Sequence, residues 1–256
     1  MPAEESTAAI VLRARDYSES DRIVTLLTSD FGKLSGIAKG AKASRRRFER
    51  KLEPFSYVRL YFKRRPQGQL VFITKAERGE LAAPQIEDDL GKIALGSYML
   101  ELADALTTEE GEAAEAYRVL ETALDALGRG AASAALRQAF ELKILRATGF
   151  GLDFDLCRVC GLDIAADDGP LHFVASRGGV LCARCGGDRP EAAMPLSVAN
   201  GLAIARLAQA PIEESARLAH GGRQGELAIA RFLATILDRR LRSIEFLDSV
   251  ISPARD

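Results

Sequence analysis

Residues 56–63, SYVRLYFK, alternate between two kinds of side chain. Valine, leucine and phenylalanine occupy every second position, and tyrosines and bases fill the positions between them. Successive side chains of a strand point to opposite faces, so this period predicts a β-strand with an apolar inner face. The outer face of that strand would present Tyr57, Arg59, Tyr61 and Lys63.

Similar period-2 segments recur on both sides of this strand, with turn residues between them. They cover residues 8–15, 22–28, 33–39 and 69–76. Five short strands within about 80 residues, with a glycine-containing corner at residues 31–36 (FGKLSG), predict a small closed barrel of the OB-fold type. An SH3-like barrel is the close alternative.

From about residue 84 the apolar residues recur at spacings of three and four, which predicts helices. The expected helices after the first lie at 111–127, 133–148, 196–209 and 223–247. Residues 150–193 interrupt this pattern and hold all four cysteines. We therefore expect a multidomain α and β protein with an N-terminal OB-fold barrel and an all-α C-terminal domain that carries a zinc-finger insertion. The predicted domains are 1–80, then 81–149 with 194–256, and the insertion 150–193.

The charge of the 256-residue chain is unevenly distributed. Residues 1–80 hold 17 Lys and Arg against 10 Asp and Glu, a net charge of +7, whereas residues 81–256 hold 18 against 26, a net charge of −8. A basic N-terminal third favours a module that binds a polyanion. The 47% of apolar residues indicates a folded protein. The acidic start and the absence of a membrane-length apolar run predict a cytoplasmic protein with no membrane partner.

Most of the positive charge is concentrated in residues 39–51, which we call the basic loop. It contains seven bases and one acid, more than pairing within the segment can neutralise. One interpretation is a solvated loop. The interpretation that we favour is a phosphate-binding loop, because Phe48 is interleaved and backbone charge beside aromatic rings is typical of single-strand binding. For Tyr57 and Tyr61, base stacking and ordinary packing are both open. The predicted DNA-binding residues are Lys39, Lys42, Arg45, Arg46, Arg47, Arg50, Lys51, Tyr57, Arg59 and Tyr61, with help from Arg13, Arg15, Arg64 and Arg65.

The four cysteines form two CxxC pairs, Cys157 with Cys160 and Cys182 with Cys185. Two such pairs joined by a hairpin-length spacer predict a tetrahedral four-sulfur site for Zn²⁺. Four sulfur ligands leave no coordination position for an activated water, so the expected role of the zinc is structural. Unrelated reduced cysteines and an iron–sulfur cluster are the weaker alternatives, as is His172 in place of one cysteine.

The sequence offers little material for catalysis, and we expect no enzyme and no catalytic residue. It has only two histidines, and residues 36–42 (GIAKGAK) lack the glycine that a phosphate loop places before its lysine. A metal-dependent nuclease that uses Asp153 and Asp155 is a further alternative, but acids beside a cysteine hairpin are more often turn formers.

Several stretches resemble the bacterial recombination mediator family RecO. They are residues 11–24 (VLRARDYSESDRIV), 27–36 (LTSDFGKLSG), 38–42 (AKGAK), 46–48 (RRF) and 52–55 (LEPF). Weaker likeness continues through the CxxC pairs to residues 241–247 (LRSIEFL).

The resemblance implies an OB-fold followed by a helical domain, with a four-cysteine zinc site in many members. It also implies binding of single- and double-stranded DNA, annealing of complementary strands, and action with RecR in loading RecA onto DNA coated by single-strand binding protein (SSB), in the bacterial cytoplasm at the nucleoid. The alternative is an interaction scaffold whose basic patch binds an acidic partner tail instead of DNA.

Overall fold

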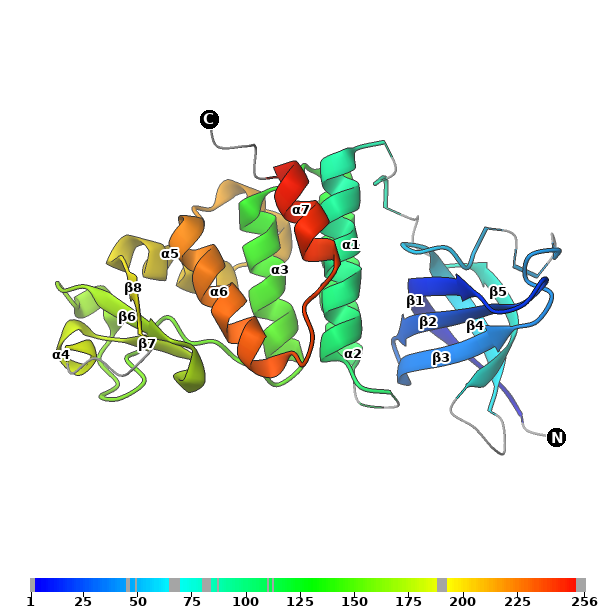
Figure 1. The fold of residues 1–256 in the computed structure, drawn as a ribbon, viewed down its shortest axis with the longest axis horizontal. Helices are drawn as coiled ribbons and strands as arrows, with labels where there is room; N and C mark the ends of the chain where they lie inside the picture. The colour runs from blue at the N-terminus through cyan, green and yellow to red at the C-terminus, as the bar shows by residue number, and fades with distance from the viewer. Residues whose placement is uncertain are drawn as a thin grey trace. The chain divides into compact units, whose positions relative to one another are not determined.

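The computed structural model describes residues 3–44, 47–48, 50–64, 70–79, 84–86, 88–109, 111, 113–187 and 193–251. Its contacts divide the chain into two compact units, residues 1–129 and 130–256. The first unit holds a β-barrel and two helices, and the second holds the remaining helices and a small sheet (Figure 1). The domain limits predicted from the sequence stay predictions.

Five strands close into a barrel, as the sequence predicts. They are β1 (Glu4–Asp16), β2 (Arg22–Thr28), β3 (Gly32–Ala38), β4 (Tyr57–Lys63) and β5 (Val71–Arg78). Their order is β1-β2-β3-β5-β4, β4 pairs back onto β1, and β3 and β5 are parallel. A closed five-stranded barrel with this crossover is OB-like, which decides against the SH3-like alternative.

The length of β1 is what closes the barrel. Its first half pairs with β4, from Glu4 to Ile10, and its second half pairs with β2, from Ala9 to Asp16. The register shifts between Val11 and Arg13, which marks a bulge where the strand bends. One strand therefore serves as the neighbour of two others.

The inner face of the barrel is apolar. Val58, Leu60 and Phe62 are exposed by 2% or less, which confirms the face predicted from their alternation. They pack with other buried residues of the barrel, including Phe48 and Leu52. The barrel interior is therefore a packed core and not a ligand channel.

Two helices of the first unit pack on the outside of the barrel. Helix α1 (Leu90–Leu106) begins at Asp89, whose side chain accepts a hydrogen bond from the Lys92 amide, and α2 (Ala114–Arg129) follows. Helix α1 packs against β1, and α2 packs against β1 and β2. The nearly buried Asp104 of α1 pairs with Lys33 and Arg13 of the barrel, at 3.1 and 3.0 Å. Charge and packing together hold α1 against the sheet.

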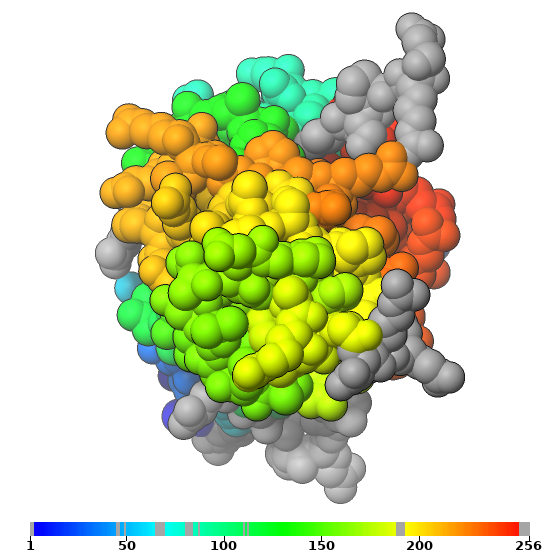
Figure 2. Space-filling model, turned by 90° about the vertical axis from the view of Figure 1, so that its left-hand side faces the viewer, coloured from blue at the N-terminus to red at the C-terminus, as the bar shows by residue number. Residues whose placement is uncertain are grey.

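The second unit consists of helices around a three-stranded sheet of order β7-β6-β8. The sheet and the short α4 belong to the cysteine segment, which Figure 2 shows in yellow-green to yellow on the face turned to the viewer. The elements are α3 (Ala134–Ala147), β6 (Leu171–Val174), β7 (Gly179–Leu181), α4 (Ala183–Gly186), β8 (Met194–Leu196), α5 (Val198–Gln209), α6 (Gly222–Ile236) and α7 (Ser243–Ile251), with 3-10 turns at Ile164–Ala166, Ala175–Arg177 and Ile212–Arg217.

The single helix predicted over 223–247 is wrong, because the chain leaves helical geometry after Ile236. Leu237 is extended, and α7 begins only at Ser243. Leu241, between the two helices, is buried. No glycine or proline marks this break, so the apolar spacing continues through it in the sequence. Among the described residues, every helix is too short or too polar to cross a bilayer.

Candidate nucleic-acid interface and metal centre

The basic loop covers one end of the barrel between β3 and β4, and contacts with the barrel core and with β5 hold it there. Phe48 and Leu52 are buried in the barrel core, and the Ala76 amide of β5 donates to the Arg47 carbonyl at 3.1 Å. The expectation that Phe48 contributes an aromatic ring to the binding surface is therefore wrong. Its ring anchors the described part of the loop to the barrel core instead.

The described cations of the basic loop lie at the surface. Lys39, Lys42, Arg47 and Arg50 are exposed, and Lys51 is half-buried. Arg47 donates to the Lys39 carbonyl at 3.1 Å and lies 5.0 Å from the Phe48 ring centroid, so its side chain follows the loop. Arg45 and Arg46 lie outside the described residues. The structure thus brings the five described loop bases together at one barrel end.

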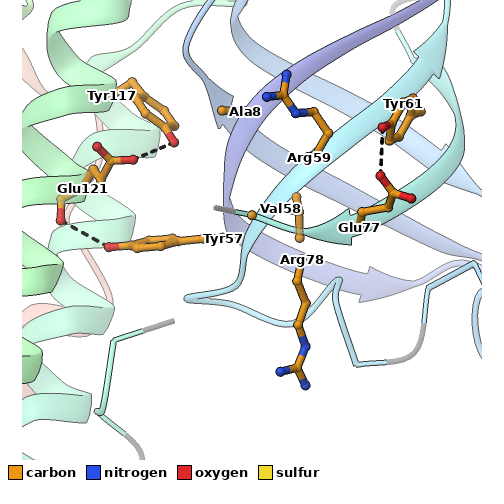
Figure 3. Close-up of a pocket in the computed structure, with 10 residues that line it drawn as sticks. Ala8, Tyr57, Val58, Arg59, Tyr61, Glu77, Arg78, Tyr117 and Glu121 are labelled. Carbon is orange, nitrogen blue, oxygen red and sulfur yellow. Dashed lines mark hydrogen bonds between the residues drawn. The ribbon is translucent and has the colours of Figure 1, made fainter. Parts of the chain in front are cut away.

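Tyr57 of β4 does not face solvent. Its side chain is buried against α2, where its hydroxyl lies 3.1 Å from the Glu121 carbonyl oxygen and 3.1 Å from an Asp125 carboxylate oxygen (Figure 3). Burial, followed by the charge of Asp125, raises the pKa of the Tyr57 hydroxyl. These contacts favour packing over base stacking for Tyr57.

Tyr61 and Arg59 line a cavity of about 400 Å³ between the β4–β5 surface and α2. The Tyr61 hydroxyl donates to Glu77 at 2.8 Å, and Arg59 and Arg78 point away from one another in Figure 3. The wall also contains Tyr117 and Glu121, so the lining holds two arginines and two carboxylates. The charges of the lining side chains are thus balanced in number. The surroundings of Tyr61 and Arg59 therefore differ from the basic loop, in which positive charge predominates.

The four cysteines converge on one point, although they come from two segments 21 residues apart. Their Sγ atoms all lie within 4.8 Å of one another, and those of Cys160 and Cys182 are 3.7 Å apart. Sulfur ligands at about 2.3 Å from a tetrahedral zinc would be about 3.8 Å apart. The donor set and its spacing therefore fit a four-sulfur metal site.

The backbone around Cys157 favours the thiolate form of that cysteine, which is the form that binds metal. Burial raises the pKa of the Cys157 thiol, but the amides of Cys160, Cys182 and Val159 outweigh it and lower that pKa to about 6. Gly161 turns the chain after the first pair with a φ of 71°. His172 lies in the middle strand β6 and is not one of the clustered ligands.

The acids beside the cysteines have structural partners. Asp153 accepts the amides of Asp155 and Leu156 at 2.9 and 3.2 Å, and Asp155 accepts the Gln209 amide group. Asp167 accepts the amide of Ala183, the first residue of α4, at 2.8 Å. These are turn and cap contacts, which agrees with the interpretation of the acids as turn formers.

Two family models match the chain: Recombination protein O N terminal over residues 1–80 and Recombination protein O C terminal over residues 87–245. Proteins called DNA repair protein RecO are similar over nearly the whole length. One from Anaeromyxobacter sp. (strain K) is 39% identical over 94% of both chains, one from Myxococcus xanthus is 35% identical over 94% of this chain and 96% of its own, and one from Syntrophus aciditrophicus is 31% identical over 97% and 96%. The chain belongs to the RecO family. Its role therefore lies in DNA repair and recombination.

Two arginines that the charge argument added to the RecO interface have acidic partners within the protein. Arg13 pairs with Asp104 at 3.0 Å, and Arg64 pairs with Glu5 at 3.1 Å. Arg15 is exposed near the end of β1, and Arg65 lies outside the described residues. Unlike Arg13 and Arg64, the exposed Lys39, Arg47 and Arg50 of the loop lie close together in the sequence.

Sequence reasoning missed the part that the β1–β2 turn, residues 17–21, plays at this surface. The Asp21 carboxylate accepts the Gly40 amide at 2.9 Å, and Lys42 donates to the Ser18 carbonyl at 2.9 Å. The turn thus supports the start of the basic loop. Its signal in the sequence is the cluster Ser18-Glu-Ser-Asp21, whose side chains favour local hydrogen bonds with backbone amides.

Proposed function

We propose that this RecO-family protein binds single- and double-stranded DNA and anneals complementary single strands. With RecR it would help to load RecA onto DNA coated by SSB, in the bacterial cytoplasm at the nucleoid. Family membership supports the general role in repair. The finer steps rest on the resemblance and on the surface described above.

The observation that carries the proposal is the basic loop. Lys39, Arg47 and Arg50 are exposed on a backbone that Phe48 and Leu52 fix to the core. Cations on a fixed framework neutralise phosphates at a lower ordering cost than cations on an unstructured tail. Contacts of this kind are indifferent to sequence, which suits an annealing protein that must accept any strand.

We further propose that the four cysteines hold Zn²⁺ with a structural role. Its ligands would be Cys157, Cys160, Cys182 and Cys185. Four sulfur ligands would cross-link the two cysteine-containing segments and leave no coordination position for a reactive water. The resemblance implies a protein that is not an enzyme, and we propose the same here. His172 lies in strand β6, and the Nδ1 atom of His220 accepts a hydrogen bond from the Gly222 amide.

Fluorescence anisotropy of a labelled oligonucleotide across a salt series tests the proposal, with the complementary strand added afterwards to the same sample. We expect affinity that falls with salt at a log–log slope of about −0.7 for each neutralised phosphate, and faster duplex formation than without protein. Binding without any acceleration would contradict annealing.

A matched titration separates DNA binding from the scaffold alternative. The same protein is mixed with a labelled acidic peptide of equal charge to the oligonucleotide. Preference for the oligonucleotide supports the proposal. Retention of the peptide with no retention of DNA at low salt would favour the scaffold.

A further inference from the structure

The outer face of the barrel's first strands is covered by helices. In β2, Val24 and Leu26 belong to the barrel core, whereas Ile23, Thr25 and Leu27 point the other way and are still exposed by 7% or less. Helix α2 packs against this strand and against β1. OB-folds commonly bind oligonucleotides on the face of their second and third strands and on the loops beside it. Here that face of β2 is closed, which directs a strand to the loops.

One aromatic ring stands open among those loops. Tyr17 is 63% exposed, at the start of the β1–β2 turn. Its amide donates to the Asp21 carbonyl at 3.0 Å, so the turn has a closed backbone. Of the other aromatics that the sequence suggested, Phe48 and Tyr57 are buried, and Tyr61 is half-buried with its hydroxyl bonded to Glu77. Tyr17 is therefore the most exposed of these rings.

The turn and the basic loop form one surface. Besides the Gly40–Asp21 and Lys42–Ser18 bonds described above, the Lys42 amide donates to the Ser20 carbonyl at 3.1 Å. These three contacts place residues 17–21 directly beside the start of the basic loop. The ring of Tyr17 and the exposed cations consequently belong to the same end of the barrel.

Acids at this end of the barrel pair with only some of the loop cations. The Asp16 carboxylate pairs with Lys42 at 2.9 Å and with Arg22 at 3.1 Å, and these partners lower the pKa of Asp16. Lys42 is thus paired with Asp16, and Lys39 lies near enough to Asp21 to help lower the pKa of that carboxyl. Lys39, Arg47 and Arg50 are left as the described cations that lie exposed beside the turn.

We propose that Tyr17 is a stacking platform for an unpaired base of single-stranded DNA, the phosphates of which lie along the basic loop. The inference rests on the proposed DNA-binding function and specifies how a single strand is distinguished from a duplex. Bases of a single strand are free to stack on a protein ring, whereas those of a duplex are already stacked on one another.

The chain contains no tryptophan, so Tyr17→Trp introduces a single reporter at the proposed platform. We expect single-stranded DNA to quench its fluorescence, with duplex DNA of the same length quenching it much less. Leu90→Trp is the matched control, because Leu90 is 59% exposed at the start of α1 and would give a solvent-exposed tryptophan away from the turn. Its fluorescence should change little with either DNA.

Affinity measurements on two further variants complete the test. Tyr17→Ala should weaken single-strand binding about fivefold or more and leave duplex binding within about twofold, since a stacked base is worth a few-fold to a hundredfold in affinity. Tyr17→Phe should bind as the unchanged protein does, because the ring and not the hydroxyl makes the contact. Tyr17 is exposed, so neither change disturbs the core.

Two failures are distinguishable. If the unchanged protein binds single strands by anisotropy but Tyr17→Trp is not quenched, or Tyr17→Ala binds as tightly as the unchanged protein, the platform is overturned and DNA binding stands. If the unchanged protein retains no oligonucleotide at low salt, the platform and the proposed function are both overturned.

Discussion

The loop end of the barrel and the four-cysteine site are both turns that carry charge, yet they are held in opposite ways. At the loop end, backbone and side-chain hydrogen bonds such as Gly40 to Asp21 hold the turn, and the cations stay exposed. At the cysteine site, four sulfur atoms point inward to one shared centre. The first arrangement keeps its charge available to a ligand, whereas the second uses its charge to hold itself together. Loss of one contact should therefore be tolerated at the loop end and not at the cysteines.

The largest expected effect comes from removing one sulfur ligand. Cys182→Ser should abolish stoichiometric zinc and destabilise the second unit by about 3 kcal/mol or more, because structural zinc binding is worth on the order of 10 kcal/mol. Metal analysis and thermal unfolding measure this. Val159→Ala is the control, since Val159 lies between two ligands with a 54% exposed side chain. Full zinc content and unchanged melting in Cys182→Ser would remove the contrast between the two sites.

The next effect concerns the cations of the basic loop. Replacing Arg45, Arg46 and Arg47 together with Ala should weaken single-strand binding about tenfold or more and flatten the salt slope by about 2, at 0.7 for each phosphate. Melting should hardly change. Anisotropy in a salt series measures both affinity and slope.

A control of equal charge separates local contact from net charge. Arg223, Arg231 and Arg240 are exposed residues of the second unit, and replacing all three with Ala removes the same charge. The basic loop would lose its assigned role if this control flattened the slope as much as the loop variant does.

A smaller effect separates the two tyrosines of β4. Tyr57→Phe removes a hydroxyl held by Glu121 and Asp125 and should cost about 1 kcal/mol of unfolding free energy, while single-strand affinity stays constant. Tyr61→Phe, at a half-buried position, should cost less. Denaturant unfolding measures the difference. Weaker DNA binding by Tyr57→Phe at unchanged stability would revive base stacking for Tyr57.

The smallest effect is a titration at the loop end. The hydrogen bond from the Gly40 amide, then that from Ser20, lowers the pKa of Asp21 below its ordinary value of 3.8. The stabilisation of the turn by this carboxylate is thus complete above pH 3.8 and is lost as the pH falls through the lowered pKa. The amide resonance of Gly40 should follow with a midpoint below 3.8, and a midpoint at or above 3.8 would contradict the contact.

The sequence was sufficient for features that depend on local spacing. Alternation in residues 56–63 predicted the inner face of β4, and two CxxC pairs predicted the clustered sulfur atoms. Both follow from short-range geometry, because a period of two fixes the face of a strand and a two-residue gap points both thiolates inward.

Features that depend on distant partners escaped the sequence analysis. Alternation places Tyr57 outside the barrel but does not reveal that α2 covers it. Phe48 lies among bases in the sequence, yet the open end of the barrel core receives its ring. The segment between α6 and α7 contains no glycine or proline that would mark a break in the sequence. Leu241 of this segment is buried, a contact with the fold that local spacing does not reveal.

The double pairing of β1 also delays closure of the barrel while the protein is being synthesised. The segment Glu4–Ile10 pairs with Lys63–Tyr57, so half of the first strand has no partner until β4 leaves the ribosome. At about 5 to 20 residues per second, the 35 residues from Thr28 to Lys63 take about 2 to 7 s to synthesise. During that interval a hairpin of β1 and β2 presents an unpaired edge, which is a template for pairing with another nascent chain. A nascent chain on a neighbouring ribosome of the same messenger therefore competes with β4 for pairing with the N-terminal strand.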